Sequence, residues 1–317
     1  MDITVILCTF NRSQSLSKAL ASIAVQELPH QVTWEVLVVD NNSRDQTRSV
    51  VEEFCRKYPN RYRYVFEPRQ GKSHALNAGI REASGEVLAF LDDDVMAEPT
   101  WLQNLTVPLR QGECAGVGGR ILPEKTFTPP HWIPLQERYA LAPLAVFTPD
   151  LEAGPFTDAP FGANMAFQKR VFEKHGGFRT DLGPQPGGIH PQKSEDSEFG
   201  HRVLGAGEKL RYEPSAVVYH VVPASRVRKG YFLAWWSDKA RSDIRAFGVP
   251  TDTSWLVAGV PLYLFRRLAV WSLRWLVTLE PSRRFSCQVK AWSNFGQIVE
   301  CYQQAHGGKV AVRTEQI

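Results

Sequence analysis

Short apolar runs alternate with longer amphipathic stretches through the first ninety residues of the chain. Four of the runs are rich in β-branched and aromatic residues and predict buried strands. They lie at residues 3–8, 34–39, 62–66 and 86–91. The stretches between them space their apolar residues as helices do. Strands and helices that alternate in this way predict an α/β fold with a mostly parallel sheet, in which ligands bind at the carboxyl ends of the strands.

Three consecutive aspartates, residues 92–94, follow the fourth predicted strand directly. Adjacent carboxylates repel one another and cost desolvation energy, so a fold that keeps them together needs something to offset that cost. A divalent cation such as Mg²⁺ or Mn²⁺ does this, and these ions also bind diphosphates. The alternative is a solvated acidic loop. Thr9 and Asn11 follow the first strand and Asp40 ends the second, so polar groups from three strands are expected to meet at one sheet edge.

Composition and charge narrow the class of protein. The 317 residues are 43% hydrophobic and 22% charged, which is typical of a globular chain with one or two domains. Residues 201–317 carry 17 Lys and Arg against 8 Asp and Glu, whereas residues 1–200 are acidic on balance. This asymmetry predicts a catalytic front part and a back part that faces an anionic partner.

The cysteines and the N-terminus predict a cytoplasmic location. The five cysteines show no CxxC spacing, so neither a zinc site nor a disulfide framework is expected. The N-terminus lacks a signal-peptide pattern, and no uncharged apolar stretch reaches the ~18 residues that span a bilayer. Gly71-Lys72-Ser73 resembles the end of a P-loop, but Phe66 occupies the position of its first glycine. Neither an NTPase nor a dehydrogenase is expected.

Six segments, in this order, resemble the motifs of family 2 glycosyltransferases of the bacterial polysaccharide-biosynthesis type. They are CTFNR at 8–12, VVDNNS at 38–43, GKSHALNAG at 71–79, DDD at 92–94, GANMAF at 162–167 and SEDSEF at 194–199. The resemblance implies the GT-A fold, with a mostly parallel central sheet flanked by helices and a C-terminal helical extension. It implies a catalytic domain at 1–225, with a nucleotide-sugar half at 1–122 and an acceptor half at 123–225. Residues 226–317 form the extension.

The resemblance also implies a donor site and a metal site. The metal, Mn²⁺ or Mg²⁺, is assigned to Asp92, Asp94 and His220, and a core histidine is the alternative for His220. The donor-binding residues it implies are Thr9, Phe10, Asn11, Arg12, Asp40, Lys72, Asn77, Asp92, Asp93 and Asn164. Simpler roles stay open for several of them, since Phe10 fits a core, Asp40 fits a turn cap, Lys72 fits a solvated loop and Asp93 fits a structural role.

Two adjacent acids at the start of a predicted helix, Glu195 and Asp196, fit the base that activates an acceptor hydroxyl. The resemblance assigns the base to Asp196, with Glu195 as a substitute, and implies inversion at the anomeric carbon. The alternative is that both acids merely complement the helix dipole. In the irregular region 123–188, rich in Pro and Gly, we expect long loops and a strand near 163–167.

The C-terminal part combines arginines with tryptophans. In a helix predicted within 255–279, the arginines share one face, and the opposite face carries Leu264, Leu268, Trp271, Trp275 and Leu279. This pattern predicts a helix in the interface of an anionic membrane, which places the protein at the cytoplasmic face of the inner membrane. The alternative is a helix that packs on the catalytic domain. No nucleic-acid partner is expected, because no nucleic-acid-binding motif is present.

The sequence therefore predicts a metal-dependent, inverting glycosyltransferase. Its expected partners are a nucleotide-diphosphate sugar as donor and a glycan or lipid-linked glycan as acceptor. One rival is a nucleotidyltransferase that forms sugar nucleotides, although the first strand lacks the Gly-rich loop of such enzymes. Another rival is a catalytically silent protein that binds sugar nucleotides or glycans.

Overall fold

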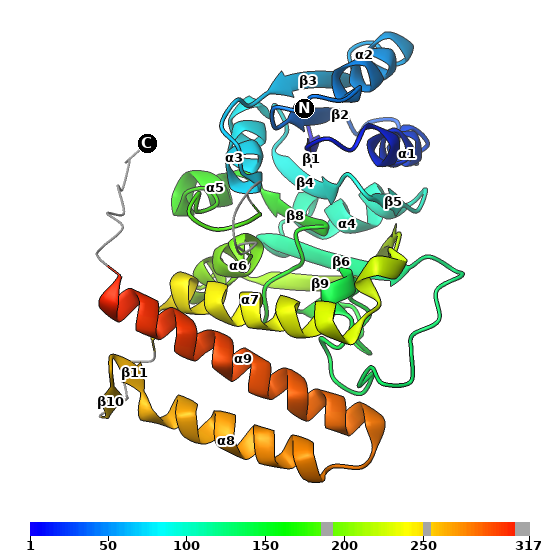
Figure 1. The fold of residues 1–317 in the computed structure, drawn as a ribbon. Helices are drawn as coiled ribbons and strands as arrows, with labels where there is room; N and C mark the ends of the chain where they lie inside the picture. Colours follow the sequence, from blue (N-terminus) through cyan, green and yellow to red (C-terminus); the bar gives the residue numbers. More distant parts are fainter. Residues whose placement is uncertain (185–192, 250–254, 308–317) are drawn as a thin grey trace. The chain divides into compact units, whose positions relative to one another are not determined.

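The computed structural model describes residues 1–184, 193–249 and 255–307, and the chain forms two compact units. Unit 1 comprises Met1–Thr128 and Leu144–Pro223, and unit 2 comprises Pro129–Pro143 and Ala224–Ile317. The chain therefore passes between the units three times. The predicted division at residue 225 stays a prediction, and the units differ from it in the segment Pro129–Pro143 (Figure 1).

The described residues of unit 1 form a sheet of nine strands in the order β3-β2-β1-β4-β8-β6-β9-β5, with β7 paired to β9. The strands are β1 Ile3–Thr9, β2 Trp34–Asp40, β3 Tyr62–Phe66, β4 Val87–Asp92, β5 Val95–Ala97, β6 Gly116–Pro123, β7 Gly154–Pro155, β8 Asn164–Gln168 and β9 Leu210–His220. Strands β3, β2, β1 and β4 are parallel to one another. The residues of β1, β2 and β4 are almost entirely buried, as their continuous apolar runs indicated, whereas the edge strand β3 is mostly half-buried.

Beyond β4 the sheet is mixed rather than mostly parallel. Strand β8 runs antiparallel to both β4 and β6, β5 and β7 run antiparallel to β9, and β6 is parallel to β9. A parallel neighbour needs a crossover connection, usually a helix. The chain between β6 and β8 contains no α-helix, so β8 can return antiparallel beside β6. The α/β class is confirmed, and the parallel arrangement holds for the first four strands.

Helices of unit 1 pack on this sheet. They are α1 Ser13–Ala24, α2 Thr47–Lys57, α3 Lys72–Glu82, α4 Trp101–Arg110, α5 Lys169–His175 and α6 Glu195–Gly205. Helix α3 lies against β1 and β2, and α4 lies across β4, β6, β8 and β9. Gly79 allows the close approach of α3, because a Cβ there would come within 2.6 Å of the Ile6 side chain. The predicted loop region 123–188 holds β7, β8 and α5, and its residues 185–188 lie outside the described residues.

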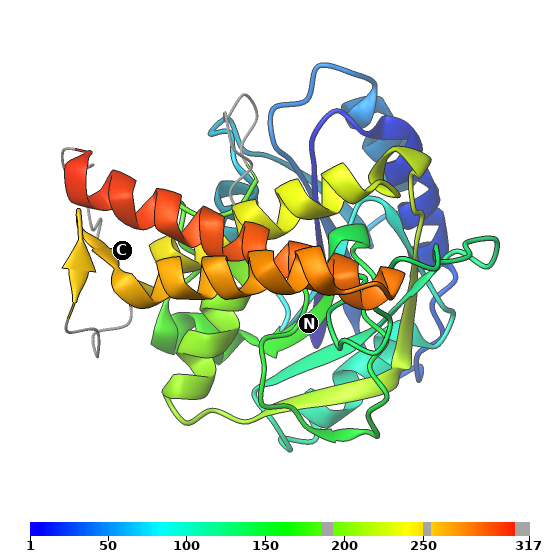
Figure 2. The ribbon, with the colours of Figure 1, turned by 60° about the horizontal axis from the view of Figure 1, so that its bottom comes forward.

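Unit 2 is helical, and α9 packs against both α7 and α8 (Figure 2). Its elements are α7 Lys229–Phe247, β10 Leu256–Val257, β11 Val260–Pro261, α8 Leu262–Val277, α9 Pro281–His306 and a 3₁₀ turn at Ala224–Arg226. A second 3₁₀ turn, Ala142–Leu144, lies where the chain returns to unit 1. Inside the unit, Arg241 and Arg245 bind the buried carboxylate of Glu300. No helix of the described residues is long and apolar enough to cross a membrane.

The face of α8 that was expected to meet lipid packs on α9 within unit 2 over most of its length. Leu264 is fully buried in a cluster with Cys301 of α9, and the ammonium of Lys290 lies 4.9 Å from the ring centre of Trp271. The face packs on α9 because α9 offers it an apolar surface. Within unit 2, α9 therefore covers most of this face, while Leu279 at its end is exposed. Contact of α8 with a membrane stays a prediction, and so does its packing on the catalytic domain.

The segment Pro129–Pro143 is anchored in unit 2 by an aromatic cluster and a carboxylate. The ring of Trp132 lies 5.1 Å from that of Phe232 and 4.8 Å from that of Phe285, both edge-to-face. Glu137 accepts hydrogen bonds from Ser286 and Lys290 of α9. Buried aromatic pairs of this kind add to the apolar burial that holds a segment in place.

Candidate active site

Three parallel strands end side by side at one edge of the sheet. In the pairing register, Thr9 at the end of β1 lies opposite Asp40 at the end of β2, and Cys8 lies opposite Asp92 at the end of β4. The convergence predicted from the sequence is present, and it brings the acidic run beside the loop that follows β1.

Asp93 points into the protein. Its carboxylate accepts a hydrogen bond of 2.7 Å from the Thr9 hydroxyl and one of 3.1 Å from Arg12. Burial raises the pKa of Asp93 to about 6, although the positive charge of Arg12 opposes the rise. These contacts match the structural role for Asp93, and a donor contact by Asp93 stays an untested prediction.

Asp94 lies between two cationic or basic groups. Oδ2 of Asp94 accepts a 2.6 Å hydrogen bond from Arg12 and lies 3.5 Å from Nε2 of His220, at the end of β9. Burial by itself would raise the pKa of Asp94, but the contacts with His220 and Arg12 outweigh it and hold the pKa well below its usual range. The other ring nitrogen of His220, Nδ1, is buried and has no hydrogen-bond partner among the described residues.

Lys72, at the start of α3, connects the acidic run to the second pair of acids. Its ammonium donates a 2.7 Å hydrogen bond to Asp92 and lies 3.8 Å from Oε1 of Glu195. Burial would lower the pKa of Lys72, but the charges of Asp92, Glu195 and Asp196 outweigh it and raise the pKa above its usual value. The ammonium of Lys72 therefore interacts with the carboxylates of Asp92 and Glu195, which are far apart in the sequence.

Glu195 and Asp196 begin α6 after Ser194, whose backbone is left-handed with φ 76° and whose side chain does not cap the helix. Asp196 accepts a 2.9 Å hydrogen bond from the backbone N–H of Gly162 through Oδ2, and its Oδ1 accepts from Ser197 N–H. These bonds fix the orientation of the Asp196 carboxylate. Glu195 is buried, and burial together with the neighbouring Asp196 raises its pKa to about 7, against the opposing charge of Lys72.

Asn77 is engaged with the backbone of Phe178. Its Nδ2 donates to the Phe178 carbonyl and its Oδ1 accepts from the Phe178 N–H, both at 2.8 Å. The side chain of Asn77 thus connects α3 to the loop before α6. A donor contact by Asn77 remains untested, and these two bonds give it a structural role.

Asn164, at the start of β8, is fully buried and uses its whole amide within the core. Its Oδ1 accepts from the indole N–H of Trp101, and its Nδ2 donates to the carbonyls of Arg120 and Ala216. Nothing in these contacts supports the expectation that Asn164 faces a sugar. We therefore leave it out of the proposed donor site and treat it as a residue that positions the strands.

Asp40 caps the turn that follows β2, as its alternative role required. Its Oδ1 accepts a 2.9 Å bond from Ser43 N–H, and its Oδ2 accepts a 2.8 Å bond from the Tyr64 hydroxyl. The side chain of Ser43 in turn accepts from the N–H of Asn11. The loops after β1 and β2 are thus tied together, while the half-buried ring of Phe10 lies beside them.

Asp92, Asp94 and His220 carry the oxygen and nitrogen donors that a divalent cation binds, but their side chains do not surround a common point. Among the described residues, no group of three His, Cys, Asp or Glu side chains is placed to hold a metal. Lys72 and Arg12 take the positions beside Asp92 and Asp94. Carboxylates with an imidazole are nonetheless a donor set that suits Mn²⁺.

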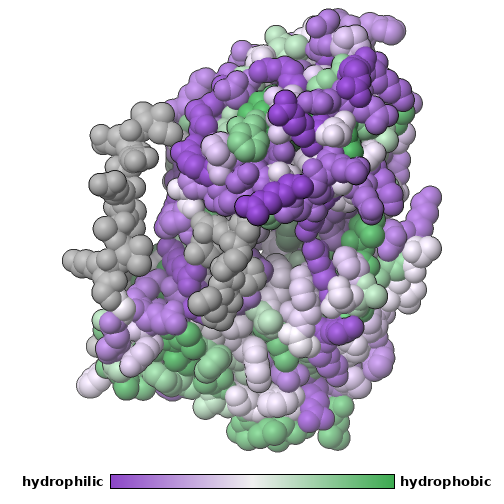
Figure 3. Space-filling view, turned by 45° about the horizontal axis from the view of Figure 1, so that its top comes forward, coloured by the Kyte–Doolittle hydropathy of each residue, from purple (hydrophilic) through white to green (hydrophobic). Residues whose placement is uncertain are grey.

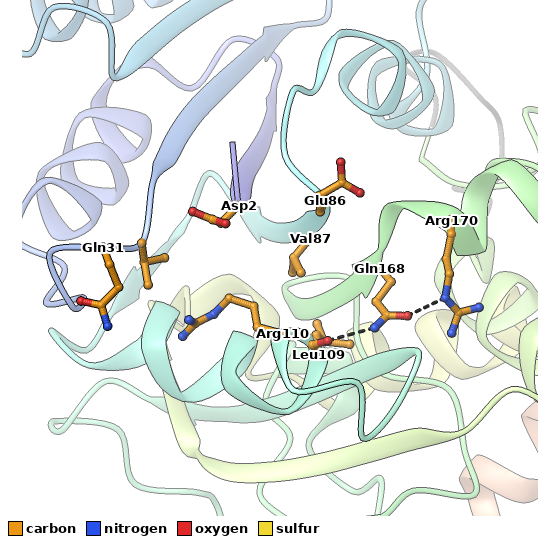
Figure 4. A pocket seen from close by; sticks show the side chains of 9 residues that line it. Asp2, Gln31, Glu86, Val87, Leu109, Arg110, Gln168 and Arg170 are labelled. Carbon is orange, nitrogen blue, oxygen red and sulfur yellow. Dashed lines mark hydrogen bonds between the residues drawn. The ribbon is translucent and has the colours of Figure 1, made fainter.

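A separate pocket of about 500 Å³ lies at the opposite end of the strands (Figure 4). Its lining includes Asp2 before β1, Val87 at the start of β4, and Arg110. Because this pocket is at the amino ends of β1 and β4, it does not include the residues gathered at the carboxyl edge.

Comparisons with known proteins place the chain among glycosyltransferases. The model of the family "Glycosyl transferase family 2" matches residues 4–176. The succinoglycan biosynthesis protein ExoM of Rhizobium meliloti is 27% identical over 236 residues, which are 74% of this chain and 70% of that protein. A glucosyl-dolichyl phosphate glucuronosyltransferase of Haloferax volcanii is 27% identical over 225 residues, 69% of each chain.

A solved structure shares the fold. The mannosyltransferase PcManGT from Pyrobaculum calidifontis, in complex with GDP-Man and Mn²⁺, superposes with a TM-score of 0.57 at 21% identity. The match covers 97% of this chain and 76% of that one. At this identity the likeness establishes the GT-A fold and leaves the residue roles to the geometry of this site.

Proposed function

Since the chain belongs to glycosyl transferase family 2 and is a glycosyltransferase, we propose that it transfers a sugar from a nucleoside-diphosphate donor to a hydroxyl group, with inversion at the anomeric carbon. The position of Lys72 carries this proposal. Its ammonium lies within 2.7 Å of Asp92, on the donor side, and within 3.8 Å of Glu195, beside the proposed base. The acidic run and the second acid pair therefore belong to one site.

On the donor side, the leaving diphosphate gains negative charge as its bond to the sugar breaks. Arg12 and Lys72 already lie beside Asp94 and Asp92, and they supply positive charge at this edge of the sheet. A divalent cation held by Asp92, Asp94 and His220 would add Lewis-acid stabilisation of the diphosphate. Thr9 and Arg12 hold Asp93 in place beneath these carboxylates, and Asp40 keeps the neighbouring turn in shape.

On the acceptor side, Asp196 acts as the general base. The acceptor oxygen forms a bond to the anomeric carbon, its proton passes to Asp196, and the diphosphate leaves with the electron pair of the broken C–O bond. The backbone N–H of Gly162 orients the carboxylate for this transfer. Glu195, with its pKa raised to about 7, keeps a proton beside Asp196 up to about neutral pH and so limits the repulsion between the two acids there.

The names of the relatives support a glycan or lipid-linked glycan as acceptor. ExoM is named for succinoglycan biosynthesis, and the Haloferax relative is named for a glucosyl-dolichyl phosphate substrate. We therefore place the acceptor of this protein in the same chemical class. A nucleotidyltransferase is the second candidate from the sequence, and the family match disfavours it.

The proposal is tested by measuring nucleoside diphosphate release from UDP-, GDP- and dTDP-sugars, with Mn²⁺ and then with EDTA. We expect metal-dependent release from one donor and its loss in Asp94→Ala. Unchanged release in EDTA would contradict the proposed metal dependence. Formation of pyrophosphate from an NTP and a sugar phosphate would show that the protein is a nucleotidyltransferase instead. Binding without turnover, measured by thermal shift with the same nucleotides, would support the non-catalytic alternative.

A further inference from the structure

Helix α8 carries apolar residues on two sides, and within the described part of the chain α9 covers one of them. The covered side contains the buried Leu264 and the half-buried Trp271 and Trp275. The other side faces solvent, where Leu273, Leu276 and Val277 are 63%, 65% and 67% exposed. A helix that is apolar nearly all round is normally buried, so something is expected to cover this second side.

We call this second side the outer face of α8. It consists of Leu262, Phe265, Val270, Leu273, Leu276 and Val277, all of which are exposed. At ~100° per residue these six positions lie within an arc of about 140°, so they form one continuous stripe along the helix. In Figure 3 the hydrophobic colouring gathers along the lower edge of the view, the side on which Figure 1 draws α8.

The charges on α8 are all positive. Arg266 lies within the outer face, Arg274 and Arg267 lie along one border of it, and the helix contains no Asp or Glu. Among the described residues, no carboxylate forms an ion pair with any of these three arginines, and Arg274 rests over the ring of Trp271. Long arginine side chains can extend past apolar neighbours so that the guanidinium stays in the polar layer.

The apolar surface continues beyond the two ends of α8. At the N-terminal end, the carbonyl of Trp255 accepts a hydrogen bond from Leu262 N–H, and the Trp255 side chain is 75% exposed. At the C-terminal end, Leu279 is exposed and Arg283 and Arg284 follow in the first turn of α9. An amphipathic indole next to a stripe of aliphatic and basic side chains is the pattern of a membrane interface.

We propose that the outer face of α8 binds the surface of an anionic lipid bilayer, with the helix lying in the plane of the interface. The aliphatic side chains enter the boundary between headgroups and acyl chains, and the arginines contact the negatively charged headgroups. The sequence prediction placed the face with Leu264 and Trp271 against lipid. Because that face packs on α9, the opposite face of α8 is assigned to the lipid here.

Charge favours lipid over a second copy of the chain. In a symmetric contact between two outer faces, each copy would present Arg266, Arg267 and Arg274 without a carboxylate of α8 to pair with them. Like charges brought together in this way are destabilising, whereas anionic headgroups neutralise them. The proposal is independent of the enzymatic reaction, since it rests on α8 and its flanking residues alone.

Sedimentation of the purified full-length protein with vesicles tests the proposal without any substrate. We expect binding to vesicles that contain phosphatidylglycerol in phosphatidylcholine, weaker binding to phosphatidylcholine alone, and release by salt. Arg266→Gln, Arg267→Gln and Arg274→Gln should each lower the partition coefficient about fivefold. The double variant Leu273→Glu/Leu276→Glu should reduce binding to the level of a blank without lipid.

The matched control places the same charges on exposed apolar residues of unit 1. Val25→Glu/Phe66→Glu changes two exposed side chains outside α8 and should bind vesicles as the unmodified protein does. Circular dichroism checks that each variant is folded, and quenching of tryptophan fluorescence by lipids with brominated acyl chains tests the unmodified protein directly. Absence of both binding and quenching overturns the proposal. So does a dimer, detected by ultracentrifugation, that Leu273→Glu/Leu276→Glu converts to monomer while the vesicles bind nothing.

Discussion

Nε2 of His220 lies 3.5 Å from Oδ2 of Asp94, at a point where β9 pairs with β5 directly after the acidic run. His220 faces Val95 in the antiparallel register, so the sheet itself fixes the position of the imidazole beside Asp94. Nδ1 of His220 has no hydrogen-bond partner in the described ranges 1–184, 193–249 and 255–307, so no such bond supports a purely structural role. This pairing is the strongest structural support for a metal ligand outside the acidic run.

Replacement of His220 tests that role. We expect His220→Ala to raise the Mn²⁺ concentration needed for half-maximal activity by about 10–100-fold, because a side chain that holds or orients the metal is lost. The measurement is nucleoside diphosphate release over a Mn²⁺ titration. His30→Ala, at an exposed loop position, is the control. Identical titration curves for His220→Ala and the unmodified protein would remove His220 from the metal site.

Asp196→Asn and Glu195→Gln separate the two candidate bases. We expect Asp196→Asn to lower kcat by about 10²–10⁴-fold and to leave donor affinity unchanged, because only proton transfer is lost. Asparagine keeps an oxygen that can still accept from Gly162 N–H. Single-turnover rates and donor binding by calorimetry provide the measurement. A larger loss of kcat in Glu195→Gln than in Asp196→Asn would reassign the base to Glu195.

The raised pKa of Glu195 predicts a dependence of stability on pH. An unfolded glutamate loses its proton near its ordinary pKa, whereas folded Glu195 keeps it until about pH 7. The stability that Glu195 contributes is therefore fully present below about pH 4.5 and is lost as the pH rises through about 7. We expect Glu195→Gln to raise Tm at pH 8 relative to the unmodified protein, and to have much less effect at pH 5.

Thermal unfolding of both proteins across this pH range, followed by circular dichroism, measures the effect. Glu53→Gln, which replaces an exposed carboxylate on α2, should change Tm equally at pH 5 and pH 8. If the difference in Tm between Glu195→Gln and the unmodified protein is constant with pH, titration of Glu195 does not contribute to the pH dependence of stability.

Removal of the Lys72 charge is expected to destabilise the site. Lys72→Met leaves Asp92 and Glu195 without the cation between them, at a cost of about 1–3 kcal/mol in the free energy of unfolding. Urea denaturation gives this value, with the exposed Lys18→Met as the control. We also expect Lys72→Met to bind nucleoside diphosphate more weakly. Unchanged stability together with unchanged nucleotide affinity would argue that Lys72 is merely solvated.

Asn164 offers a test between a structural role and a sugar contact. Asn164→Ala removes the acceptor of Trp101 N–H and the donor to two carbonyls, so we expect a loss of about 3 kcal/mol in the free energy of unfolding. The folded fraction should keep the KM of the unmodified protein for the donor sugar. A variant that is as stable as the unmodified protein but has a raised KM would restore the sugar contact.

The sequence predicted the part of the fold that depends on local pattern. Continuous apolar runs located β1 to β4, and the polar residues that end them located the site edge, because parallel strands bring their carboxyl ends together. The direction of β8 was not predictable in this way, since a strand of five residues with three apolar ones at its centre does not distinguish a parallel from an antiparallel neighbour.

Long-range pairings account for what sequence reasoning missed. The hydrogen bond from Tyr64 to Asp40 and the one from Gly162 N–H to Asp196 join separate segments, and a backbone N–H carries no sequence signal at all. Lys72 was expected either to meet phosphate or to be solvated, and its contact with Asp92 depends on tertiary structure. Helical periodicity identified the face of α8 with Leu264 and Trp271, but it did not predict that α9 would cover this face or that exposed apolar residues would lie on the opposite side.

The anchoring of Trp132 between Phe232 and Phe285 has a practical consequence for engineering this protein. A polypeptide that stops at Pro223 would keep Trp132 and Glu137 but lose every partner that they have on α7 and α9. An exposed indole on an otherwise intact catalytic unit invites aggregation. A chimera that borrows the helical unit from a relative must therefore import two stretches of sequence, the residues 129–143 and the C-terminal helices, as a matched set.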